Sequence, residues 1–215
     1  MMINEILIYV INGLIIINLI LYLLLVIFNR RKSVDNITGF DATKDLLSEY
    51  DRINIIEGNS YFSFYNIKRK IIKLSKKDYY GNDVSALSLS MIESGISVND
   101  SKFINIFSKI IPTLKIINLF WLISLFINYI SVNISDAKIG LFIIGIIIII
   151  RYLYISILNN SYNFISENIK KIKGIKKENS NNILNFVSKT IVFNKMQFIA
   201  EILIIIRMVA IILNM

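Results

Sequence analysis

The chain has 215 residues, of which 55% are hydrophobic, and its formal net charge is +9. This apolar share and a mean hydropathy of +0.61 exceed those of ordinary soluble domains and predict a membrane protein. The chain contains no Cys and no His, which excludes disulfides, thiolate chemistry, and the side chain that most often binds zinc or acts as a general base. The sequence predicts a mainly α, polytopic membrane protein that forms a single membrane domain over residues 1–215.

Four apolar stretches are long enough to cross a bilayer, which takes about 20 residues. The first has no charged residue, and it lacks the basic start and the small-residue cleavage site of a secretory signal. We therefore predict four transmembrane helices, over residues 6–28, 116–134, 139–158 and 191–213.

Basic residues mark the polar segments between these stretches. Arg30, Arg31 and Lys32 directly follow the first stretch, and residues 159–190 contain six Lys against two acidic residues. By the positive-inside rule, segments 29–115 and 159–190 are predicted to be cytoplasmic and both termini to lie outside. Basic loops of this kind follow from orientation and attract anionic lipid, so we predict the lipid bilayer as a partner and no nucleic acid.

The first polar segment, 29–115, carries local signals for helices and strands. Thr38 and Asp41 have the spacing of a capping box ahead of apolar positions at helical intervals. The stretch "YFSFYNIKRKIIKLS" predicts two short strands, over residues 61–65 and 71–74, around a basic turn. We expect a short β-hairpin within a small cytoplasmic α+β region.

A longer helix is expected after this hairpin. Gly81 interrupts the chain, and Asn82 or Asp83 then caps a helix that runs to about residue 98. An amphipathic helix is predicted to follow over residues 102–111.

The second polar segment, 159–190, is predicted to be helical with a turn near Gly174 and Ser180. Neither polar segment is large enough to bury a good core by itself. We therefore expect the two segments to pack on each other.

The middle of the helix expected up to residue 98 reads "SMIESGIS", with one acid, Glu93, among apolar and small residues. The longer stretch "FYNIKRKIIKLSKKDYYGNDVSALSLSMIESG" and the earlier "TGFDA", residues 38–42, resemble the bacterial membrane-bound neutral zinc metallopeptidases (YugP-like proteins). In that family a first span precedes a cytoplasmic hairpin, a helix with a His-Glu-x-x-His zinc motif, two spans, an acidic third zinc ligand and a last span. The predicted elements of this chain follow the same order.

The resemblance places the zinc motif on the stretch from Ile92 to Ile96. Glu93 falls at the general base and Gly95 at the glycine before the second ligand, but Ile92 and Ile96 occupy the two histidine positions. An aliphatic side chain has no lone pair to donate, so these positions cannot bind zinc. The resemblance therefore implies a degenerate member of the family.

The acidic third ligand of the family falls on Tyr162, and Glu167, five residues further on, is the alternative. Asp41, Asp45 and Glu49 recur at helical spacing, but we expect them to form a solvated face rather than a metal site. We predict no cofactor and no metal.

The surroundings of Glu93 allow more than one interpretation. Leu89, Ile92 and Ile96 form one apolar stripe that packs a core, and we expect Glu93 beside it to be partly solvated or to contact a Lys or an amide. Without the resemblance, Glu93 is an ordinary surface acid on a helix. Many Ser are present, but without His only a Ser–Lys dyad remains as a nucleophile, and we do not expect one.

The last apolar stretch contains three charged residues, Lys195, Glu201 and Arg207. Lys195 lies near one end and can reach the interface. Glu201 and Arg207 are about 120° apart around a helix, so each needs a partner elsewhere, and Arg151 is a candidate for Glu201. We expect a structural pair rather than an ion or proton path.

The resemblance, with Ile92 and Ile96 at its two histidine positions, implies a catalytically inactive homologue of membrane zinc metallopeptidases, a pseudopeptidase that binds a partner or client at the cytoplasmic face. The partner would be an active relative, a client membrane protein or another subunit. The alternative is a structural or assembly subunit of a membrane complex with no peptide-binding role. An open cleft above Glu93 would favour the first function, and a groove filled by Ile92, Ile96 and Tyr162 would favour the second.

Overall fold

The computed structural model describes residues 2–34, 36–50, 52–60, 62–98, 117–130 and 133–213. The amphipathic helix predicted over residues 102–111 lies outside these described residues. The chain forms two compact units. The first unit comprises Met1–Leu23, Ile116–Ile155 and Val192–Met215, and the second unit comprises Leu24–Lys115 and Ser156–Ile191.

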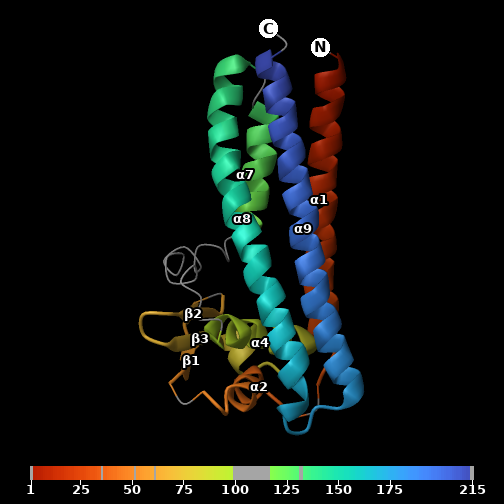
Figure 1. Ribbon diagram of the computed structural model, residues 1–215. Coiled ribbons are helices and arrows are strands. Elements are labelled where there is room, and N and C mark those ends of the chain that lie inside the picture. The colour runs from red at the N-terminus through yellow and green to blue at the C-terminus, as the bar shows by residue number, and fades with distance from the viewer. Residues whose placement is uncertain are drawn as a thin grey trace. The chain divides into compact units, whose positions relative to one another are not determined.

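In the first unit, segments of four helices run side by side (Figure 1). They belong to α1 (Met2–Arg30), α7 (Ile117–Ile130), α8 (Ile134–Asn168) and α9 (Lys177–Leu213). Asn18 Nδ2 donates a hydrogen bond to the carbonyl of Phe193 at 3.0 Å, which joins α1 to α9. Asn128 Nδ2 donates to Asn12 Oδ1 at 2.8 Å, which joins α7 to α1.

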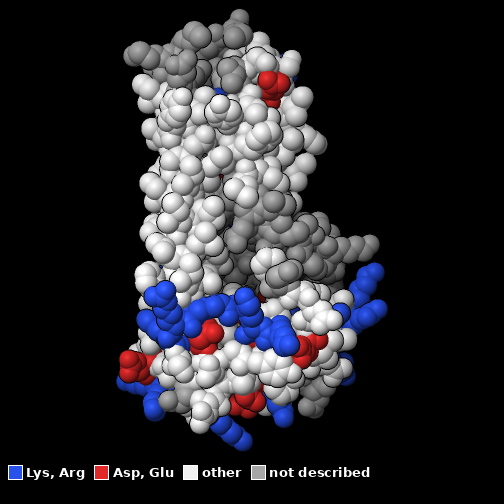
Figure 2. Space-filling view, turned by 180° about the vertical axis from the view of Figure 1, so that it is seen from behind, with Lys and Arg blue, Asp and Glu red and all other residues white. Residues whose placement is uncertain are grey.

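Three helices of the described chain are long and apolar enough to cross a membrane, and they cover Ile6–Arg30, Ile134–Lys171 and Lys177–Leu213. Large apolar side chains such as Tyr9, Phe142 and Ile199 point outward from them and are 74%, 71% and 58% exposed. On the face drawn in Figure 2, the surface of the apolar helices carries almost no Lys or Arg. Side chains of this kind are suited to contact with lipid, which confirms the prediction of a membrane protein.

The helices differ in extent from the predicted spans. α8 continues to Asn168, beyond the predicted end at residue 158, and α9 begins at Lys177, well before the predicted start at residue 191. The hydropathy pattern marks only the apolar part of a helix, whereas backbone hydrogen bonding carries the helix on into polar sequence. Most of segment 159–190 is therefore made of helical extensions of the spans.

The second predicted span corresponds to α7, which has 14 residues. A helix of this length is shorter than the roughly 20 residues that a bilayer requires. Residues 116, 131 and 132 of the predicted span lie outside the described part of the chain. The described residues thus give three spanning helices where the sequence predicts four.

The second unit contains a three-stranded sheet of order β1-β3-β2. β2 (Phe64–Asn66) and β3 (Ile71–Ser75) are antiparallel and confirm the predicted hairpin, although its first strand begins later than predicted. β1 (Asn54–Gly58), which was not predicted, pairs in parallel with β3 and places Asn54 opposite Ile71. β1 and β2 are therefore the two edges of the described sheet.

Helices pack against this sheet, namely α2 (Gly39–Leu46), α3 (Lys76–Tyr79) and α4 (Val84–Val98). The predicted capping box is confirmed, because Thr38 Oγ1 accepts the Asp41 N–H and Asp41 Oδ2 accepts the Thr38 N–H. Asp83 Oδ1 accepts the N–H of Ala86 at 2.8 Å, so Asp83 is the cap predicted for the start of α4.

The two polar segments pack on each other within the second unit, as predicted. Lys171 Nζ lies 2.7 Å from Glu49 Oε1, and the N–H of Lys173 donates to Asp45 Oδ2 at 3.0 Å. Asp45 and Glu49 therefore contact the second polar segment. The prediction that they form only a solvated face was incomplete, because it missed these contacts. The predicted turn at Gly174 is confirmed by its φ of +84°, but the predicted turn at Ser180 is wrong because this residue lies inside α9.

Candidate functional site

The residues onto which the resemblance places the zinc motif lie on α4, and all of them are buried. Ile92, Glu93 and Ile96 are 4%, 2% and 1% exposed. The predicted packing of Ile92 and Ile96 into a core is confirmed, whereas Leu89 of the same predicted stripe is only partly buried. The expectation that Glu93 is a surface acid or partly solvated is wrong, because Glu93 is 2% exposed and nearly every residue of α4 is buried.

α4 packs closely against α8 at Gly95. A Cβ atom at this position would lie 2.6 Å from the Cα of Ser161 and 2.7 Å from its Cβ. Tyr162, the next residue on α8, is half-buried, so the structure brings the segment of the predicted third-ligand position beside the motif helix. Glu167 is exposed and lies about 120° around α8 from Ser161, away from the helix contact.

Replacing Gly95 by Ala is expected to destabilise the protein by about 1–3 kcal/mol, because the added methyl group meets the backbone of α8. Thermal unfolding of the purified protein in detergent measures this change. Gly145→Ala is the matched control, since a Cβ at Gly145 on α8 meets nothing within 4 Å. Equal melting temperatures for the two variants would contradict the close approach at Gly95.

The donor set around the motif does not fit zinc. Tetrahedral zinc sites take nitrogen, sulfur or carboxylate ligands, and Ile92 and Ile96 offer none. Within the described ranges, no group of three His, Cys, Asp or Glu residues is placed to hold a metal ion. Glu93 alone supplies a carboxylate at the motif, so no hydrolytic step through a metal follows from these side chains.

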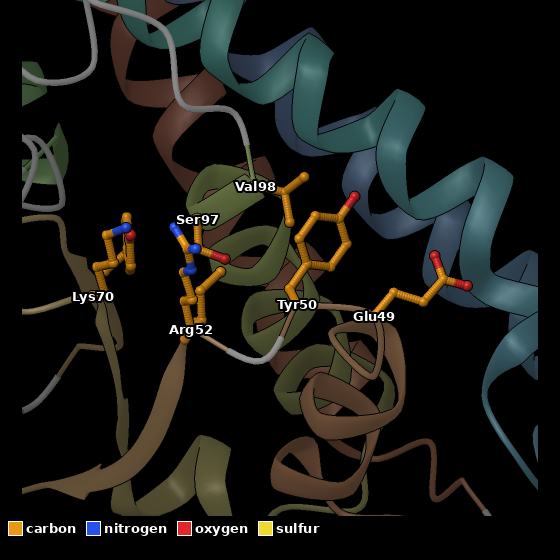
Figure 3. A pocket seen from close by; sticks show the side chains of 8 residues that line it. Glu49, Tyr50, Arg52, Lys70, Ser97 and Val98 are labelled. Carbon is orange, nitrogen blue, oxygen red and sulfur yellow. The ribbon is translucent and has the colours of Figure 1, made fainter.

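A cavity of about 410 Å³ lies in the second unit at the C-terminal end of α4 (Figure 3). Its walls come from the end of α4, from strand β2, from the starts of β1 and β3, and from the loop after α2. The sequence pattern predicted no cavity here, and among the lining residues it singled out Glu49 alone, as part of a solvated acidic face. The lining consists of Glu49, Tyr50, Arg52, Ile53, Tyr65, Lys70, Ser97 and Val98. Ser97 lies one helical turn beyond Glu93, so the cavity adjoins the motif helix without exposing Glu93 itself.

A buried polar cluster centred on Asp78 was also missed from the sequence. The side chain of Asp78 is 4% exposed, and its Oδ2 accepts hydrogen bonds from Ser63 Oγ at 2.6 Å and Ser75 Oγ at 2.8 Å. Its Oδ1 lies 3.1 Å from Nη2 of Arg30. The Ser-x-x-Asp spacing of residues 75 and 78 was the available signal, because Ser75 caps α3 through the Asp78 N–H.

Glu201 and Arg207 of the last apolar stretch each have a separate partner, as predicted from their positions about 120° apart on the helix. Arg151 Nε lies 2.8 Å from Oε2 and 3.0 Å from Oε1 of Glu201, so the predicted contact is confirmed. Arg207 donates instead to the carbonyl and to Oδ1 of Asn128, both at 2.7 Å. These groups join α7, α8 and α9 inside the first unit.

A comparison with known protein families gives a match over nearly the whole chain. The model of the family described as "putative neutral zinc metallopeptidase" matches residues 3–212. No curated protein and no solved structure matches the chain.

Proposed function

We propose, from the premise that this chain belongs to the neutral zinc metallopeptidase family, that it is a degenerate, YugP-like member that binds proteins and does not cut them. The observation that carries the proposal is the pair Ile92 and Ile96 at the two histidine positions of the motif. Their aliphatic side chains fill a core, where a metallopeptidase needs a metal and an activated water. Glu93 keeps the position of the general base without a metal to act on.

The proposed protein crosses a bacterial plasma membrane four times, with α7 as part of the second span. The segments 29–115 and 159–190 then face the cytoplasm and both termini face outside, in accord with the basic residues that flank the spans. Its partner at the cytoplasmic face is an active relative, a client membrane protein or another subunit.

Two features of the second unit support protein binding. β2 is an edge strand of the described sheet, and an extended peptide can add to such an edge through backbone hydrogen bonds. Tyr65 of this strand lines the cavity at the end of α4, so the strand edge and the cavity are adjacent. A bound peptide segment would pair with the edge of β2 and place a side chain in the cavity.

Zinc content tests the proposal. The wild-type protein, purified from membranes without chelators, is expected to contain no stoichiometric zinc by elemental analysis, because the motif positions lack donors. The Ile92→His/Ile96→His variant is expected to gain zinc affinity, since two histidines at i and i+4 share one helix face. One zinc per wild-type chain, or a peptidase activity that Glu93→Gln abolishes, would overturn the proposal.

The second candidate is a structural or assembly subunit with no peptide-binding role. The burial of Glu93 favours it, because an open cleft above this residue is not found in the described part of the chain. Partner capture separates the two functions. A partner of the first kind is released by an added extended peptide, and a partner held by the spans is not.

A further inference from the structure

The cavity at the end of α4 carries positive charge from two residues, Arg52 and Lys70, which precede strands β1 and β3. We infer that it binds a carboxylate group of an acidic peptide segment, with Arg52 and Lys70 as the cationic ligands. This inference rests on the proposed protein-binding function and names the class of segment that is bound.

Strand register brings the two cations together. β1 and β3 are parallel with Asn54 opposite Ile71, and the N–H of Asn54 donates to the carbonyl of Lys70 at 3.0 Å. Residues that precede these strands must therefore lie at the same end of the sheet. Arg52 and Lys70 precede β1 and β3 and both line the cavity (Figure 3).

The charge of these two residues is not balanced inside the cavity. Glu49 is the acidic residue of the described lining, and its Oε1 lies 2.7 Å from Nζ of Lys171. In Figure 3 its side chain points away from Arg52. Within the part of the chain that the structure describes, no acid forms an ion pair with Arg52 or Lys70. The cavity wall therefore presents net positive charge to a ligand.

The lining matches a carboxylate in its hydrogen-bonding chemistry. The guanidinium of Arg52 can donate two parallel hydrogen bonds to the two oxygens of a carboxylate, and the ammonium of Lys70 adds a compact charge. Ser97 Oγ already donates to the carbonyl of Ser94 at 2.7 Å, so the donors for an anion come from the sheet side of the cavity. Charge-assisted bonds of this kind are about twice as strong as neutral ones.

The setting of the cavity favours a peptide over a small free anion. A volume of about 410 Å³ lies within the usual range of ligand pockets, roughly 300–1,000 Å³, and exceeds what a lone carboxylate or phosphate fills. Tyr65 belongs to the edge strand β2, and Tyr50 adds a second aromatic wall. A segment that pairs with β2 can place an acidic side chain or its terminal carboxylate between Arg52 and Lys70.

Two substitutions remove the charges with little risk to folding. Lys70 has a φ of +50°, a left-handed conformation that Asn adopts more easily than Lys, so Lys70→Asn removes the charge without adding strain. Arg52→Gln removes the second charge from an exposed loop. Lys68→Asn is the matched control, since Lys68 belongs to the same hairpin turn and does not line the cavity.

Binding of fluorescent synthetic peptides to the full chain in detergent, followed by anisotropy, tests the inference. Two apolar host peptides differ only in carrying Glu or Gln at the same positions. The Glu peptide is expected to bind about tenfold more tightly, and the Arg52→Gln/Lys70→Asn variant is expected to lose that advantage. Lys68→Asn is expected to keep it. The same peptides with a free or an amidated C-terminus distinguish a side-chain carboxylate from a terminal one.

The outcomes separate this inference from the proposed function. Equal binding of the Glu and Gln peptides would overturn the carboxylate site and leave protein binding intact. Binding of neither peptide would count against protein binding at this strand edge and against the inference. Competition by inorganic phosphate or by vesicles of anionic lipid stronger than that by the Glu peptide would also overturn it, because the cavity would then be a phosphate site.

Discussion

Replacing Glu201 by Gln is expected to destabilise the folded chain by about 3–5 kcal/mol, because the change leaves the charge of Arg151 buried without its carboxylate. Both side chains are at most 1% exposed, and both oxygens of Glu201 contact Arg151 Nε. Ser124 Oγ also donates to Glu201 Oε1 at 3.2 Å. In an apolar setting, each of these groups is costly to leave unpaired.

The melting temperature of the purified variant in detergent measures this effect. Replacing both partners, as in Arg151→Met/Glu201→Met, is expected to recover most of the loss, because no unpaired charge then remains. Ile199→Ala on the exposed face of α9 is the control for general damage to the helix. A melting temperature for Glu201→Gln equal to that of the wild type would contradict a structural role for the pair.

The sequence predicted those parts of the fold that depend on local pattern. Apolar stretches located the spanning helices, and a capping box, an N-cap residue and a basic turn located α2, α4 and the β2–β3 hairpin. Arg151 could be predicted as the partner of Glu201, because a buried charge needs an opposite charge and Arg151 is the charged residue of the preceding apolar stretch, residues 139–158. Helix ends in polar sequence could not be predicted in this way, since hydropathy does not mark them.

Contacts between distant segments were the main omission. β1 is largely exposed and has no clear alternation, so only its pairing with β3 defines it as a strand. The cavity lining joins residues 49–53 to residues 97 and 98, and no local pattern in the sequence relates them. The burial of Glu93 also depends on tertiary packing, because its apolar neighbours Ile92 and Ile96 lie on a helix that is enclosed on nearly all sides.

The stretch from Ile92 to Ile96 shows what a sequence can predict about a candidate site. The chemistry of Ile92 and Ile96 is settled by residue type, since no fold can give an aliphatic side chain a lone pair. The residue types do not determine what fills the space around these two side chains, because that depends on which helix packs against α4. Gly95 allows the close approach of Ser161 on α8, and the cavity lies one turn further along α4, where Ser97 lines it.

Replacing Asp78 by Asn is expected to destabilise the second unit by about 3 kcal/mol, since Asp78 accepts two hydrogen bonds and an ion pair that hold separate elements together. Ser63 Oγ and Ser75 Oγ both donate to its Oδ2, while Ser63 Oγ also accepts the N–H of Ser75 at 2.9 Å. An amide cannot accept on both sides. Either a serine hydroxyl or Arg30 would then face an NH₂ group inside the protein.

Asp83→Asn is the matched control for this variant, because Asn keeps an oxygen to cap α4 and Asp83 contacts the same Arg30 at the longer distance of 3.7 Å.

Burial raises the pKa of Asp83, and the nearby carboxylate of Asp78 raises it further against the opposing effects of the Ala86 N–H and Arg30. A raised pKa means that Asp83 favours the folded state below its unfolded pKa of about 3.9 and that this contribution is lost as the pH rises through the folded value. Asp83→Asn is therefore expected to be neutral or slightly stabilising at pH 7, with its advantage over the wild type shrinking in acid, whereas Asp78→Asn is expected to be destabilising at pH 7. Thermal unfolding measured from pH 7 down to below about 3.9 distinguishes the two variants. Equal changes in melting temperature for both variants would mean that Asp78 does not organise the cluster.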